Sequence, residues 1–211
     1  MEMNAVFLEP LEDVEYREVI QRSRFFGVVR CVRNGADVKV IVSETGERHR
    51  NATHICYAYR IGFPNAVEFS TDAGEPSGTA GRPILGALQR SGLTNCCVLI
   101  VRFFGGIKLG VRGLIEAYGS VASEAIRLAG QVSRIPARRC YLNVRYDHLA
   151  ETMALLRKHD SVVETPEYAE DVRLFASVPI EQVDSLNEHL CERRARKMLV
   201  EFDWTDDSVV L

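Results

Sequence analysis

Residues 102–113 have the sequence RFFGGIKLGVRG, and a second glycine-rich stretch, GEPSGTAGRP, occupies residues 74–83. Together they hold seven of the fifteen glycines, two hydroxyl side chains and four basic side chains. Glycine has no Cβ, so a chain rich in it can turn tightly and bring its N–H groups close to another molecule. With arginine and lysine beside it, such a loop favours an oxyanion partner, most often a phosphate. Tight turns between packed elements are the alternative interpretation of either stretch alone.

The segments around these stretches alternate between strands and helices. The apolar run Cys96–Phe103 is typical of a buried central strand, on which Cys96 and Cys97 face opposite sides. Further strands are predicted at 16–20, 25–32, 54–61 and 67–70. Residues 36–50 fit either a strand or a helix, and we favour a helix because it makes a compact crossover. Two more helices are predicted, one capped by Thr79 and ending before Gly92, the other spanning 114–128 and ending at Gly130.

A boundary is predicted near Pro136, which separates a domain of residues 1–135 from one of residues 136–211. The second part has the order strand, helix, strand, strand, helix, strand, which is the ferredoxin-like pattern. Its strands are expected at 140–146, 162–163, 171–179 and 198–204, and its helices at 147–159, capped by Asp147, and 180–193.

Composition is ordinary for a globular protein of 211 residues, with 46% hydrophobic and 26% charged residues. No apolar run is long enough for a membrane span and no secretory signal is evident, so we expect a cytoplasmic protein without membrane contact. The six cysteines are expected to be reduced thiols. Residues 1–137 carry 16 Lys and Arg against 14 Asp and Glu, whereas residues 138–211 carry 10 against 15. An anionic partner would therefore meet the first part.

Standard catalytic and cofactor motifs are absent from the sequence. Gly105 and Gly110 have the spacing of a P-loop, but no Lys-Ser or Lys-Thr pair follows. His54 and Cys56 lie two apart on a predicted strand and share a face, where packed side chains are more common than metal ligands. No catalytic residue is identified, and no metal or cofactor is expected.

The residues in and around the glycine-rich stretches resemble the IMPACT/YigZ family. The resemblance rests on residues 72–83, 101–110, 52–54 with 58–60, and 117–119. It covers about residues 17–130, and the last part of the chain looks like the extra C-terminal domain of bacterial members.

The resemblance implies an α+β fold. The N-terminal domain would be similar to domain 2 of ribosomal protein S5 and to domain IV of elongation factor G. The C-terminal domain would be ferredoxin-like and similar to domain V of that factor. Those domains of the factor meet the ribosome and its RNA, and eukaryotic relatives regulate translation, associating with ribosomes and a kinase activator.

Three residues depart from the family pattern. Ala73 stands where a second Asp is usual, which weakens any metal proposal. Arg112 replaces a Gly and Glu116 replaces an Arg. These two residues are one turn apart on a helix and are expected to pair.

The resulting hypothesis is an RNA- or ribosome-associated regulator of translation, more plausibly not an enzyme. Cations would contact phosphates, glycines would let the backbone approach, and hydroxyls would donate hydrogen bonds; these residues are Arg82, Arg102, Lys108, Arg112, Gly78, Gly81, Gly105, Gly106, Ser77 and Thr79. A second tier comprises Arg60, His54, Asp72 and Glu75.

Two alternatives remain open from the sequence. One is an enzyme acting on a phosphorylated or carboxylated small molecule in the same cleft, with Glu75 or Asp72 as the base. The other is a protein-interaction module whose C-terminal domain docks a protein partner.

Overall fold

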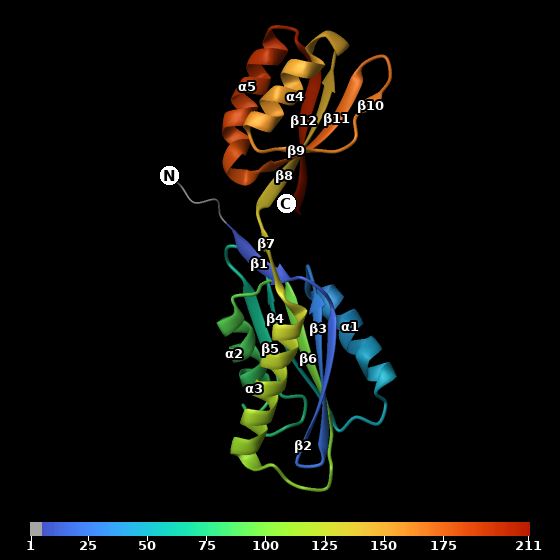
Figure 1. Ribbon diagram of the computed structural model, residues 1–211, viewed down its shortest axis with the longest axis vertical. Coiled ribbons are helices and arrows are strands. Elements are labelled where there is room, and N and C mark those ends of the chain that lie inside the picture. The colour runs from blue at the N-terminus through green and yellow to red at the C-terminus, as the bar shows by residue number, and fades with distance from the viewer. Residues whose placement is uncertain (1–5) are drawn as a thin grey trace. The chain divides into compact units, whose positions relative to one another are not determined.

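The structure is a computed structural model in which residues 6–211 are described, without the side chains of residues 206–209. The chain is a mixed α/β protein of two compact units, Phe7–Ser133 and Arg134–Leu211 (Figure 1). No helix in the described part of the chain has both the length and the apolar character needed to cross a bilayer.

The N-terminal unit contains a five-stranded antiparallel sheet with the order β2-β3-β6-β4-β5. Its strands are β2 (Val14–Ile20), β3 (Ser23–Cys31), β4 (His54–Ile61), β5 (Val67–Thr71) and β6 (Cys96–Phe103). The predicted central strand is confirmed, because β6 lies in the middle and its first six residues are almost fully buried. A separate two-stranded ribbon pairs β1 (Phe7–Pro10) with β7 (Gln131–Arg134).

Helices cover both faces of this sheet (Figure 1). Alternation along the strands explains the two layers, since Val98 and Ile100 pack under α2 (Gly81–Ser91) and α3 (Gly110–Ala129), whereas Cys97 and Leu99 pack under α1 (Gly35–Arg48). The ambiguous segment 36–50 is therefore a helix, as favoured. It begins in a capping box formed by Asn34 and Asp37.

Two expected helix caps are wrong. Thr79 does not cap α2, because its hydroxyl donates to the carbonyl of Pro76 at 2.7 Å and the helix begins two residues later. Asp147 lies in a 3₁₀ turn (Tyr146–His148) before α4 and approaches Arg145 at 3.5 Å instead of capping. Gly92 and Gly130 do follow the ends of α2 and α3, as predicted.

The C-terminal unit has the predicted succession of elements with one additional short strand, β10, and its sheet has the order β10-β11-β8-β12, with β9 also paired to β11. All of these strand pairs are antiparallel. The elements are β8 (Pro136–Val144), α4 (Leu149–Lys158), β9 (Val162–Val163), β10 (Glu167–Tyr168), β11 (Val172–Pro179), a 3₁₀ turn (Ile180–Gln182), α5 (Val183–Ala195) and β12 (Leu199–Val210). Leucines of both helices, with those of β8 and β11, form its apolar core.

Candidate functional site

A pocket of about 410 Å³ lies where β4 begins, β6 ends and α3 begins. Residues from both glycine-rich stretches line it, which places the two stretches at one site as the sequence suggested. The lining residues are Thr53, His54, Glu75, Pro76, Arg102, Phe104, Lys108, Leu109, Gly110, Val111 and Leu114. A second hollow of about 440 Å³ lies at the other ends of α2 and α3 and contains none of the expected site residues.

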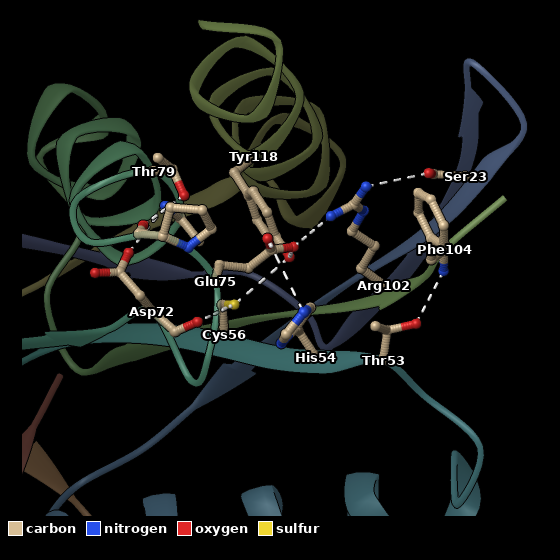
Figure 2. A network of polar contacts seen from close by, with 12 residues as sticks. Ser23, Thr53, His54, Cys56, Asp72, Glu75, Thr79, Arg102, Phe104 and Tyr118 are labelled. Carbon is tan, nitrogen blue, oxygen red and sulfur yellow. Dashed lines mark hydrogen bonds and ion pairs between the residues drawn. The ribbon is translucent and has the colours of Figure 1, made fainter. Parts of the chain in front are cut away.

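A buried ion pair forms one wall of the pocket. Arg102 Nη1 donates to Glu75 Oε1 at 2.6 Å, and the two side chains are only 6% and 3% exposed. The hydroxyl of Tyr118 donates to the same carboxylate oxygen at 2.8 Å. Figure 2 shows Glu75 between Arg102, Tyr118 and His54. The pKa of Tyr118 is raised mainly by burial and further by the neighbouring Cys56 and Glu75. Its phenol therefore stays protonated and acts as a hydrogen-bond donor.

Arg102 therefore differs from the expectation of a cation that meets a phosphate backbone. The alternation of β6 gives the reason, because Arg102 follows Val98 and Ile100 on the face that packs under α2 and α3. Its charge is balanced by Glu75, and its Nη2 donates weakly to Ser23 Oγ at 3.4 Å. Among residues 6–211, its Nε atom has no hydrogen-bond partner.

His54 and Cys56 project from β4 toward the same network. His54 Nε2 lies 4.0 Å from Glu75 Oε2, and His54 Nδ1 lies 3.0 Å from the carbonyl of Ala73. The thiol of Cys56 donates to the carbonyl of Asp72 at 2.9 Å. Burial raises the pKa of Cys56 to about 12, so the thiol is not a nucleophile at neutral pH. Within the described residues, no group of three or more His, Cys, Asp or Glu is arranged to hold a metal ion.

Asp72 holds the start of α2. One of its carboxylate oxygens accepts from the N–H groups of Ala80 and Gly81, and the other accepts from Gly78, at 2.8–2.9 Å. Burial favours the protonated form, but these three donors and Arg82 outweigh it and lower the pKa of Asp72 below its usual range. Both oxygens are thus occupied, and Asp72 is not available as a catalytic base.

We expect Asp72→Ala to lower the free energy of unfolding by about 1–2 kcal/mol at pH 7, the cost of losing a helix cap. A carboxylate with a lowered pKa in the folded state stabilises the fold above its unfolded pKa of about 4, and this contribution is lost as the pH falls through the folded value. The difference between wild type and variant, measured by urea unfolding, should therefore shrink between pH 5 and pH 3. Glu44→Ala, which removes an exposed carboxylate of α1, serves as the control. A difference that stays constant with pH would contradict this role.

The glycines of the two stretches serve different purposes. A Cβ on Gly81 would lie 2.8 Å from backbone atoms of Thr71, and one on Gly105 would overlap the backbone carbonyl of Arg22. These two glycines therefore allow the protein's own backbone to approach closely, which differs from the expected role of letting a ligand approach. Gly78 and Gly106 instead have left-handed φ angles of 76° and 87°, and a Cβ on Gly106 would meet no atom within 4 Å.

The remaining cations are not all in the pocket. Lys108 lines it and is exposed, and it pairs with no carboxylate in the described part of the chain. Arg82 is exposed in the first turn of α2. Arg112 pairs with Glu116 at 2.8 Å, as expected from their helical spacing, while its side chain remains 92% exposed. Arg60 lies near the far end of β4, where it binds Glu68 and the carbonyl of Leu93.

The two expected hydroxyl donors, Ser77 and Thr79, are not among the residues that line the pocket. Ser77 is exposed, and the hydroxyl of Thr79 donates to the carbonyl of Pro76 as described.

Two residues of the site, Tyr118 and Phe104, were assigned no role from the sequence. Tyr118 lies one turn after Leu114 on the buried face of α3. The helical spacing in the sequence indicates this position, but it does not indicate the hydrogen bond from the Tyr118 hydroxyl to Glu75. Phe104, which is 47% exposed, ends an apolar run directly before two glycines.

These features define a class of protein with mixed α/β structure, two compact units and a pocket built from two glycine-rich stretches over a buried ion pair. Residues 21–126, half of the chain, match the Impact N-terminal domain. The chain therefore belongs to the IMPACT family, as its sequence motifs indicated.

Relatives cover most of the chain. The IMPACT family member YvyE of Bacillus subtilis (strain 168) is 34% identical over 178 residues, which are 84% of this chain and 82% of the relative. YigZ of Escherichia coli (strain K12), also an IMPACT family member, is 32% identical over 189 residues, covering 88% and 92%. A crystal structure described as that of a hypothetical protein is similar with a TM-score of 0.68 at 30% identity, covering 95% of this chain and 97% of the other.

Proposed function

We propose that this protein associates with RNA or the ribosome in the cytoplasm and regulates translation. Membership of the IMPACT family supports the proposal, because the resemblance described above links that family to domains that meet the ribosome. The finer fold assignment is part of the same proposal. The N-terminal unit would be similar to ribosomal protein S5 domain 2, and the C-terminal unit would be ferredoxin-like, which its succession of strands and helices supports apart from the additional two-residue strand β10.

The observation that carries the proposal is the exposed Lys108, which lies beside the first turn of α3 and has no carboxylate partner among the described residues. A helix N-terminus presents free N–H groups and a partial positive charge, which favour phosphate. Arg82 and Arg112 add two exposed cations on the first turns of α2 and α3. Arg102 is not one of these exposed cations, because it is buried and paired with Glu75.

Replacing Lys108 and Arg82 together with alanine is expected to weaken RNA binding and flatten its salt dependence. Each lost phosphate contact lowers the slope of log K against log salt by about 0.7 for a single strand, so the double variant should lose about 1.4. Co-sedimentation with ribosomes and RNA titrations over a salt series measure both quantities. Lys39→Ala with Lys158→Ala removes the same charge from exposed positions outside the glycine-rich stretches. Equal slopes for the two double variants would refute this assignment.

A second candidate is an enzyme acting on a phosphorylated or carboxylated small molecule. The approach of His54 Nε2 to Glu75 Oε2 at 4.0 Å in the pocket wall favours it, because a paired carboxylate and imidazole are groups that move protons. A small molecule that co-purifies with the protein, together with no affinity for RNA, would support this candidate over the first.

A further inference from the structure

We propose that the pocket at the start of α3 binds one nucleotide, with its phosphate at the helix N-terminus beside Lys108 and its base against Phe104. The inference deepens the proposed function and rests on it only for the source of the nucleotide. That source is either an RNA strand with one base turned out of its stack or a free mononucleotide.

The two helices that begin at this edge of the sheet differ at their N-termini. The N–H groups at the start of α2 already have an anion, since the carboxylate of Asp72 accepts three of them. In the described part of the chain, no side chain caps α3, which begins after Leu109 and has no acidic residue in its first turn. Leu109, Gly110 and Val111 line the pocket, so this uncapped turn faces the space a ligand would occupy.

A second observation points to an anion independently of the helix. Arg102 lines the pocket, is 5% exposed and carries a permanent charge, yet its Nε–H has no acceptor among residues 6–211. Buried polar groups in folded proteins are nearly always hydrogen-bonded, so a water molecule or a ligand atom is expected to accept from this donor. Because Glu75 balances the charge of Arg102, Lys108 leaves the pocket with an excess of positive charge.

The rest of the lining suits an aromatic ring. Phe104, Pro76, Leu109, Val111 and Leu114 supply apolar surface, which inorganic phosphate would not use. The Phe104 ring is 47% exposed and lies with Arg102 Cζ 5.6 Å from its centroid. An exposed phenylalanine of this kind provides a face on which a nucleic-acid base stacks.

Polar atoms deeper in the pocket suit the edge of a base. His54 Nδ1 must donate to the carbonyl of Ala73, because a carbonyl only accepts, so Nε2 of the neutral ring is an acceptor. Glu75 Oε2, 4.0 Å away, makes no hydrogen bond with the described residues. The two acceptors can receive N–H groups of a base, and the pocket volume is within the range of about 300–1,000 Å³ found for small-ligand sites.

Isothermal titration calorimetry of the full chain with AMP, GMP, CMP and UMP tests the inference. At least one mononucleotide should bind with one-to-one stoichiometry, and its nucleoside and ribose 5-phosphate should each bind at least about tenfold more weakly, because each lacks one of the two recognised parts. Phe104→Ala should weaken binding by about 5- to 150-fold through lost stacking. Ile107→Ala, which removes an exposed apolar neighbour outside the lining, is the matched control and should leave affinity unchanged.

Single-stranded RNA in the same titration separates this inference from the proposed function. Displacement of the nucleotide by RNA would support both and identify the strand as the source. Nucleotide binding without RNA binding would support the pocket and refute the RNA proposal. RNA binding that is insensitive to Phe104→Ala, with no mononucleotide bound at millimolar concentration, would overturn the inference alone. Equal losses for Phe104→Ala and Ile107→Ala would overturn it as well.

Discussion

Gly105→Ala is expected to destabilise the N-terminal unit by about 3 kcal/mol or more, enough to leave a marginally stable domain partly unfolded. A Cβ at this position would overlap the backbone carbonyl of Arg22, which lies in the turn between β2 and β3. The clash involves two backbone segments, so rotation of a side chain cannot relieve it. Urea unfolding followed by circular dichroism measures the loss.

Two further glycine substitutions separate steric overlap from other effects of adding a methyl group. Gly106→Ala meets open space but needs a φ of 87°, and should cost about 1 kcal/mol from backbone strain. Gly35→Ala meets nothing within 4 Å at the start of α1 and should change stability by less than about 0.5 kcal/mol. If Gly105→Ala behaved like Gly35→Ala, the close approach to Arg22 would be incorrect.

Breaking the buried ion pair is the second large effect. Glu75→Ala should cost about 3–5 kcal/mol, because it leaves the Arg102 guanidinium charged and uncompensated in a site that is almost closed to water. Arg102→Met should cost a similar amount, since among residues 6–211 Glu75 would then keep only the Tyr118 hydroxyl as a close donor. Chemical denaturation at pH 7 provides the free energies.

The double variant Glu75→Ala with Arg102→Met tests whether the loss comes from the unpaired charge. Neither charge is then stranded, so the double variant should be more stable than the sum of the two single losses predicts, by about 1–3 kcal/mol. Additive losses would show that the pair is not coupled. Arg112→Ala, which breaks the exposed pair with Glu116, is a matched control and should cost less than about 1 kcal/mol.

Local patterns predicted the bounds of several elements well. The bounds of β4 and β6 agree with the strands expected from β-branched and apolar runs, and the ends of α2 and α3 agree with Gly92 and Gly130. The start of α3 was placed four residues late, at Leu114. Its first turn, Gly110–Gly113, contains two glycines and has low intrinsic helix propensity, so contacts in the fold decide it.

The site was predicted in part. The motifs marked the two stretches, and the structure brings residues of both to one pocket. Burial of Arg102 against Glu75 was not foreseen, although the alternation of the strand already placed Arg102 on the same face as Ile100. No local signal connects Asp72 with the N–H groups of residues 78–81, because the carboxylate caps a helix that starts nine residues later.

Order along the chain thus established the family, the succession of strands and helices, and the two glycine-rich stretches, because each depends on neighbours a few residues apart. The tertiary structure decided which charged side chains form ion pairs and which are exposed to solvent. Glu75, Arg102 and Tyr118 come from three separate segments, and burial in a common wall makes it costly to leave one of the charges unpaired. Lys108 remains in water at the start of an uncapped helix, and that contrast between paired and free cations arises only in three dimensions.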